Sequence, residues 1–178
     1  RSLFEESPVS LWEEDYSAIK AYLDQLPPRG PEELDDYLND HPECVTECMR
    51  LLRVLAVNKA TLDLYHADSA EELNENLGTV MGEEAAPAFR EQLLCIAAGK
   101  PLPQTETVNH TLDGDRLELL VEMRVVAGHE ETYARVLVSL LDVTERRALE
   151  EALQEQQLMT ALSQMAAGIA HDFRSLLT

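Results

Sequence analysis

A run of 35 residues at the end of the chain, from Thr144 to Thr178, contains no proline and one glycine. The run is rich in Ala, Leu, Glu and Gln, and it would form a helix of about 34 residues and roughly 50 Å. A helix of that length cannot fold back on a small domain. The chain is therefore predicted to fold as one domain followed by a long helix.

Apolar residues follow the second half of this predicted helix at spacings of three and four residues: Leu158, Leu162, Met165, Ile169, Phe173 and Leu176. The spacing is close to that of a coiled-coil seam, which needs a partner helix to cover it. Leu149 and Leu153 lie out of phase with this stripe, and the polar residues 154–157 mark the break, where a coiled coil can change its winding. We therefore expect a homodimer that pairs through the C-terminal helix.

Helical spacing also dominates the first half of the chain. It covers most of residues 17–52, where apolar residues recur every three or four positions between proline stops. Further on, Ser69 to Glu72 forms a capping box for a short helix that we expect to end near Gly78, and a longer helix is expected to stop at Gly99. These segments predict several helices packed around a core.

Strands are expected near residues 9–12, 52–57, 105–112, 117–125 and 133–142. The apolar period changes from 3.6 to 2 at Thr105, and Asp113-Gly114 is typical of a hairpin turn. The apolar density of Val136–Leu141 favours a central strand covered on both faces. Two early strands, several helices and three late antiparallel strands predict an α+β domain.

Composition excludes several classes of partner and compartment. Lys and Arg number 14 against 34 Asp and Glu, a formal net charge of −20, which disfavours binding to nucleic acid or an anionic membrane. No apolar run approaches the ~20 residues that span a bilayer, and the acidic start does not resemble a signal peptide, so we expect a cytoplasmic chain. Three cysteines, with Cys44 and Cys48 four positions apart, predict buried thiols and neither a disulfide framework nor a metal site.

His171 is the residue in the long helix that is best suited to chemistry. It lies two positions after Ile169, about 200° around the helix, so it faces away from the predicted seam and toward water. Asp172 can hydrogen-bond the imidazole, hold its tautomer and take a proton as the ring nitrogen attacks a phosphoryl group. Taken alone, however, an exposed His-Asp pair is usually a solvated surface pair.

The sequence around this pair is more specific. Met165–Phe173, followed by Leu176-Leu177-Thr178, resembles the H-box of sensor histidine kinases of the subgroup that reads Gly-Ile-Ala-His-Asp-Phe-Asn-Asn-Leu-Leu-Thr, over about 14 residues. By this resemblance His171 is the phosphoacceptor and Asp172 the neighbouring acid that assists transfer. Arg174 and Ser175 replace the usual Asn-Asn. Ser175 occupies a position that bears on removing phosphate from the partner, so the resemblance favours phosphate acceptance over phosphatase activity.

The domain before the helix resembles a PAS sensor domain. The segment Val138–Arg146, with its Asp-Val-Thr ending, is similar to the point where the last PAS strand meets a signalling helix, and Val54–Leu62 is similar to the point where an early PAS strand meets short helices. The resemblance implies a five-stranded antiparallel sheet with flanking helices and a helical insertion at about 17–52. It also implies a PAS domain at 1–143, a signalling linker at 144–157 and the start of a phosphotransfer helix at 158–178.

Asp142 and Thr144 flank the start of the long helix and have two readings. Their oxygens, with those of Glu145, can cap free amides and oppose the helix dipole. In one reading they are a cap alone; in the other they relay a signal from the sheet to the helix. The sequence leaves these two readings equally supported.

The sequence does not identify a ligand for the predicted sensor domain. The flavin-binding Asn-Cys-Arg-Phe-Leu-Gln motif is absent, and residues 83–99 contain no histidine that could ligate haem, while isolated histidines such as His66 and His110 are usually surface or satisfied core residues. A small-molecule pocket between helices and sheet would be lined by four large side chains, or filled by them. The four are Trp12, Tyr65, Phe89 and Met123.

These observations lead to one main functional hypothesis. The chain is expected to be the sensory and phosphoacceptor portion of a two-component histidine kinase, inactive by itself because it stops just after the H-box. No cofactor is identifiable in these residues, whereas ATP and Mg²⁺ are expected for the full-length kinase and a response regulator receiver domain as its partner. The alternative is a non-catalytic PAS dimerisation or interaction module, and a nucleotide cyclase is a weaker third reading.

Overall fold

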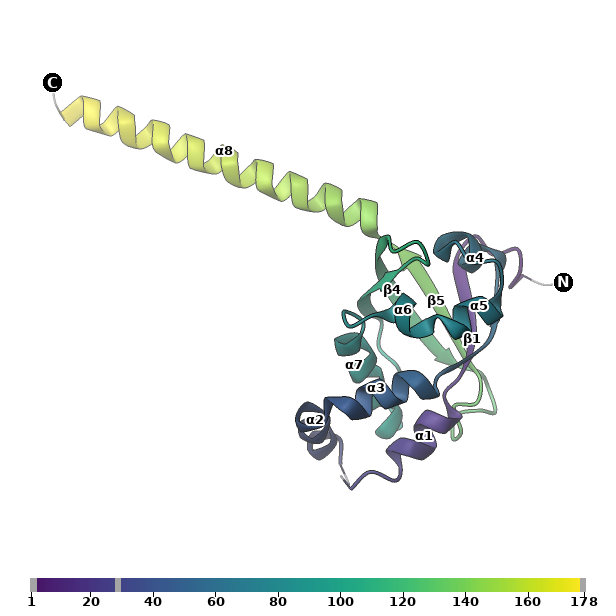
Figure 1. The fold of residues 1–178 in the computed structure, drawn as a ribbon. Helices are drawn as coiled ribbons and strands as arrows, with labels where there is room; N and C mark the ends of the chain where they lie inside the picture. The colour runs from purple at the N-terminus through teal and green to yellow at the C-terminus, as the bar shows by residue number, and fades with distance from the viewer. Residues whose placement is uncertain (1–2, 28–29, 177–178) are drawn as a thin grey trace. The chain divides into compact units, whose positions relative to one another are not determined.

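The computed structural model describes residues 3–27 and 30–176, without the side chains of Pro31 and of residues 167–176. The chain divides into two compact units, Arg1–Asp142 and Val143–Thr178. The first unit contains a mixed arrangement of helices and strands, and the second contains the long helix α8 (Figure 1).

The first unit contains a five-stranded sheet in the order β2-β1-β5-β4-β3, in which every neighbouring pair is antiparallel. The predicted five-stranded antiparallel sheet is therefore confirmed. β5 lies at the centre of the sheet, between β1 and β4. The strands are β1 (Ser10–Asp15), β2 (Arg53–Val57), β3 (Thr105–His110), β4 (Arg116–Val125) and β5 (Val136–Asp142).

Seven helices of this unit lie in two groups among the described residues. Three follow β1 and occupy the segment in which helical spacing predicted them: α1 (Ser17–Leu23), α2 (Pro31–Asp40) and α3 (Pro42–Leu51). Four lie between β2 and β3: α4 (Lys59–Tyr65), α5 (Ala70–Glu75), α6 (Leu77–Met81) and α7 (Ala86–Ala97).

The core lies between one face of the sheet and these helices. Alternate residues of β1 and β5 are buried, including Trp12, Val136 and Val138, and α7 contributes Leu93 and Ile96 to the same cluster. Because successive side chains of a strand point to opposite faces, this alternation defines an inner and an outer face of the sheet.

The prediction that β5 is covered on both faces is wrong. Its burial alternates along the strand, and Leu137 and Leu141 on the outer face are 36% and 51% exposed. β5 is central in the hydrogen-bonded order of the strands, but the described helices bury its inner face. A run of apolar residues indicates a central strand without showing how many layers cover it.

The helix predicted to end near Gly78 is two helices instead. Ser69 Oγ accepts a hydrogen bond from Glu72 N at 3.1 Å, as the capping box predicts. Asn76 then separates the helices: its Nδ2 donates to Glu72 O at 2.9 Å, and its carbonyl accepts the amide of Thr79 at 2.9 Å. Gly78 therefore lies inside α6 rather than after a helix end.

Cys44 and Cys48 are buried on α3, and neither forms a disulfide. Burial is the main cause that raises the pKa of the Cys48 thiol to about 12. A thiol that stays protonated is a poor nucleophile. The prediction of buried thiols on a helix is confirmed for Cys44 and Cys48, whereas Cys95 on α7 is partly exposed.

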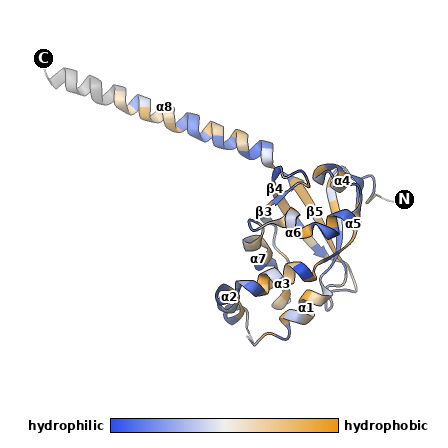
Figure 2. Cartoon of the chain, in the orientation of Figure 1, coloured by the Kyte–Doolittle hydropathy of each residue, from blue (hydrophilic) through white to orange (hydrophobic). Residues whose placement is uncertain are grey.

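The second unit is formed by α8 (Thr144–Leu176), 33 residues long, so the predicted long C-terminal helix is confirmed. Orange and blue residues alternate along its coloured part in Figure 2, and Leu158, Leu162 and Met165 are 61%, 52% and 66% exposed. The coiled-coil pairing of this stripe stays a prediction. Among the described residues, no helix is both long enough and apolar enough to cross a membrane.

Asn58 joins the beginning of β1 to the beginning of α4. Its side chain is fully buried, and its Oδ1 accepts from Leu11 N and from Thr61 N, both at 3.0 Å. Its Nδ2 donates to Val9 O at 2.8 Å and to Phe4 O at 3.1 Å. One side chain thus caps a helix and holds a strand that lies more than 40 residues earlier in the sequence.

Replacing this amide should destabilise the domain strongly. We expect Asn58→Ala to lower the free energy of unfolding by roughly 2–4 kcal/mol, because it removes a helix cap and leaves part-buried backbone groups at the start of β1 without this partner. Urea unfolding followed by fluorescence of Trp12, the one tryptophan in the chain, measures the change. The control Asn76→Ala removes an exposed amide. Equal losses in the two variants would contradict the special role of Asn58.

Candidate functional site

An internal cavity of about 60 Å³ lies between the inner face of the sheet and helices α6 and α7. This volume gives room for roughly four water molecules or for an organic group of similar size. Most of its lining is apolar. The polar side chains that line it are Glu14, Tyr16, Gln92, Thr107 and Asn109.

The pairing of the strands places inner-face side chains next to one another in the cavity wall. Trp12 pairs with Val138 across β1 and β5, and Met123 of β4 pairs with Val138 from the other side, so three inner-face side chains form one row. Phe89 and Gln92, one helical turn apart on α7, also line the cavity. The cavity therefore combines side chains from four strands, β1, β3, β4 and β5, and from the two helices α6 and α7.

The four residues expected at a ligand pocket take two kinds of position. Trp12, Phe89 and Met123 line the cavity. Tyr65 lies behind the wall: its ring packs edge-on against Trp12, with centroids 5.3 Å apart, and its hydroxyl accepts a hydrogen bond from Asn109 Nδ2 at 2.7 Å. Tyr65 thus supports two lining residues, and ligand binding by this group stays a prediction.

Glu14 is the acidic residue of the cavity, and sequence reasoning missed it. Its side chain is buried on the inner face of β1, and its Oε2 accepts a hydrogen bond from the Tyr16 hydroxyl at 2.9 Å. Burial raises the pKa of this carboxyl to about 7, and the Tyr16 hydrogen bond opposes part of that rise. The alternation of Ser10, Trp12 and Glu14 along one strand face could have identified it.

The side-chain amides of the cavity contact other polar groups. Gln92 Nε2 donates to Thr105 Oγ1 at 3.4 Å, joining α7 to β3. Asn109 Nδ2 is engaged by Tyr65. These contacts fix the orientation of both amides, so that the polar part of the wall is organised before any ligand binds.

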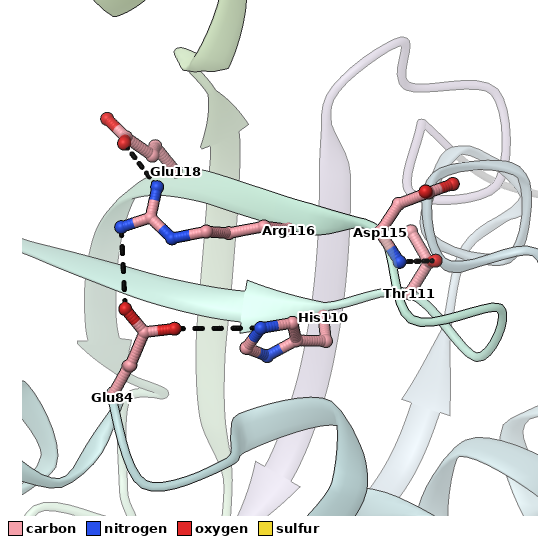
Figure 3. Close-up of polar contacts among 6 residues, drawn as sticks. All are labelled: Glu84, His110, Thr111, Asp115, Arg116 and Glu118. Carbon is pink, nitrogen blue, oxygen red and sulfur yellow. Dashed lines mark hydrogen bonds and ion pairs between the residues drawn. The ribbon is translucent and has the colours of Figure 1, made fainter.

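His110 belongs to an ion-pair cluster beside the β3–β4 hairpin, shown in Figure 3. Glu84 Oε2 lies 3.6 Å from His110 Nε2, its Oε1 lies 3.5 Å from Arg116, and Arg116 also contacts Glu118. His66 similarly pairs with Asp113 at 2.7 Å on the surface. Both histidines have carboxylate partners, and neither lines the cavity.

The predicted phosphoacceptor pair lies near the end of α8. His171 and Asp172 are in α8, but they lie outside the residues whose side chains the structure describes. Asp142 is the last residue of β5 and Thr144 the first of α8, and Arg147 N donates to Val143 O at 2.8 Å at the start of the helix. Whether Asp142 and Thr144 relay a signal stays a prediction.

No group of three or more His, Cys, Asp or Glu side chains that could hold a metal ion occurs among the residues that the structure describes.

A family model described as PAS fold matches residues 38–148 of this chain, 111 of its 178 residues. The match covers β2 to β5 and the start of α8. β1 lies before the matched range, because three helices separate it from β2.

The chain is also similar to the sensor kinase CckA of Brucella abortus. The two are 25% identical over 146 residues, which cover 80% of this chain and 15% of the kinase. This chain therefore spans about one seventh of the length of that curated relative.

Two solved structures illustrate the similarity in fold. A LOV protein of Rhodobacter sphaeroides matches with a TM-score of 0.53 and 18% identity, over 80% of this chain and 64% of that protein. The LOV domain of a blue-light activated histidine kinase from Erythrobacter litoralis matches with a TM-score of 0.50 and 14% identity, over 76% and 95% of the two chains. At these identities the likeness concerns the fold alone.

The buried carboxyl of Glu14 should make stability depend on pH. With a pKa of about 7 when folded and an ordinary value near 4.5 when unfolded, the native state binds more protons between these values, so the free energy of unfolding falls as pH rises. Glu14→Gln removes this contribution. Relative to wild type, the variant should gain about 3 kcal/mol between pH 4.5 and pH 8.

Urea unfolding of both proteins across this pH range measures the difference. The control Glu122→Gln removes a half-exposed carboxylate from the outer face of β4, and it reports pH effects common to any such change. A difference between wild type and Glu14→Gln that stays constant with pH would contradict the buried-acid assignment.

Proposed function

This chain belongs to the PAS fold family, and on that premise we propose that it is the sensory and phosphoacceptor part of a two-component histidine kinase. The observation that carries the proposal is the single helix α8, which begins one residue after the last strand of the PAS sheet and runs through the H-box-like sequence. The similarity to a sensor kinase over 80% of this chain supports the same reading.

The reaction assigned to the H-box is phosphoryl transfer from ATP. A ring nitrogen of His171 would form a bond to the γ-phosphorus as the bond to the ADP oxygen breaks, and Asp172 would hold the tautomer and take the ring proton. ATP and Mg²⁺ would be bound by a kinase catalytic domain, which the described residues do not form. The phosphoryl group would then pass to the receiver domain of a response regulator.

The exposed stripe of α8 supports pairing of two copies. Leu158, Leu162 and Met165 are each more than half exposed and recur at coiled-coil spacing. Contact between two such helices would remove this apolar surface from water, at about 25 cal/mol per Å² buried. A homodimer would also place two phosphoacceptor helices in one bundle.

The cavity is the proposed sensory site. It is internal, it is lined by side chains from β1, β4 and β5, and β5 is the strand that leads into α8. A ligand that repacks this wall would bias the strand and so the start of the helix at Asp142 and Thr144. The polar residues 154–157 would absorb the resulting change in winding.

Replacing the phosphoacceptor tests the catalytic part of the proposal. In the parent kinase, His171→Gln should lower incorporation of labelled phosphate from ATP at least 100-fold, because glutamine cannot form the phosphoramidate. The control His129→Gln changes a histidine in the turn before β5. Unchanged labelling and unchanged output in His171→Gln would favour a non-catalytic PAS interaction module.

Insertions between Gln154 and Gln157 test the relay. Each inserted residue rotates the downstream helix by about 100°, so seven residues restore the phase to within about 20° whereas two rotate it by about 200°. We expect the seven-residue insertion to keep ligand control of His171 labelling and the two-residue insertion to lose or invert it. Labelling that does not depend on the length of the insertion would refute rotation as the mechanism.

A further inference from the structure

Glu14 leaves hydrogen-bonding capacity unused inside the cavity. Of the described side chains that line the cavity, it alone can carry a full charge at neutral pH. Tyr16 donates to Oε2, and no second donor among the described residues bonds to this carboxyl. Oε1 is not a fully buried atom without a partner, since Arg90 Nε is the one such atom among the described residues. Oε1 therefore borders open space in the cavity and can accept from a ligand that brings its own donor.

The other side chains of the cavity wall indicate which kind of donor the ligand carries. Trp12 and Phe89 line the same cavity, and aromatic rings attract cations that lie over their faces. The remaining lining is largely aliphatic, with Val80, Val121 and Leu140 among its members. A carboxylate, two aromatic rings and an aliphatic wall together match a positive head group on a short hydrocarbon chain.

We propose that the cavity binds a small organic cation, a primary alkylammonium of about four or five non-hydrogen atoms, with its ammonium on Glu14 and its chain against Trp12 and Phe89. The inference rests on the sensory role proposed above and names the ligand class of that site. The net charge of −20 would raise the local concentration of such cations around the protein.

A surface groove adjoins the cavity. Leu52, Leu77 and Met81 line the cavity and also line a surface groove of about 780 Å³ next to α3, α5 and α6. These three side chains therefore separate the groove from the cavity, and an unbranched methionine can change rotamer readily. The charged residues of the groove balance in sign: Arg50, Arg53, Glu75 and Glu83.

The affinities of a cationic and of a neutral ligand should depend on pH in opposite directions. An ammonium needs Glu14 ionised, so its affinity should rise with pH, whereas a neutral acceptor such as a ketone needs Glu14 protonated, and its affinity should fall. The titratable groups facing Glu14 are Tyr16 and, through charge, Tyr65. The neighbours on other elements do not titrate: Val54 of β2, Val136 of β5, and Phe89 and Gln92 of α7.

The experiment is a titration of the 178-residue chain with propylammonium chloride, 1-propanol and sodium propionate, followed by fluorescence of Trp12. We expect saturable binding of propylammonium at least tenfold tighter than that of the other two probes. Its affinity should rise about tenfold between pH 6 and pH 8, because the ionised fraction of an acid with a pKa of about 7 rises by that factor. Glu14→Gln should weaken it at least tenfold, and Glu122→Gln should leave it unchanged.

Equal affinity for propylammonium and 1-propanol, an unchanged affinity in Glu14→Gln, or no saturable response would each overturn the cation site. If Glu14→Gln fails to fold, the pH dependence of the wild type decides. In the parent kinase, binding that leaves His171 labelling unaltered would keep the cation site and reject the sensory role. Labelling of His171 without propylammonium binding would reject the cation site and keep the kinase role.

Discussion

The hydrogen bonds of Asn58 tie β1 to the start of α4, and the rest of the PAS domain depends on that tie. β1 pairs with β2 and β5, both distant in sequence, so its place in the sheet has to be specified by contacts rather than by a short turn. Asn58 supplies them immediately after β2, by bonding to Leu11 and Val9. Once β1 is in register, the side chains of Trp12 and Glu14 necessarily point inward, and the cavity follows from the register.

The cavity shows how one strand supplies both stability and chemistry. Trp12 buries a large ring against Tyr65 and stabilises the core, while Glu14, two residues further along the same face, raises the free energy of the native state when it ionises. Buried groups with perturbed pKa values concentrate at functional sites, because a fold that needed only stability would place an apolar side chain there. Glu14, which destabilises the native state when it ionises, is therefore the residue that indicates a functional site.

The sequence was sufficient for the features that local physics determines. Period and caps predicted the strands, the long helix and the N-cap of α5, and large apolar residues at inner positions predicted three of the cavity residues. Glu14 was missed because it lies within the acidic run 13–15, which looks like a solvated segment although only the middle residue points inward. The outer face of β5 was also missed, because coverage by a second layer is a tertiary property. The helix boundary was missed because the turn at Asn76, whose side chain bonds to Glu72 O four residues earlier, does not interrupt the helical spacing of Leu73, Leu77 and Val80.

The position of β5 also affects the order in which the domain can be completed on the ribosome. The centre of the sheet is its last strand, and 120 residues separate the end of β1 at Asp15 from the start of β5 at Val136. At about 5–20 residues per second, β1 waits roughly 6–24 seconds for its central neighbour to be synthesised. During that interval Asn58 and β2 are already available, so the nascent chain can hold β1 as an edge strand whose open side still displays unpaired backbone groups.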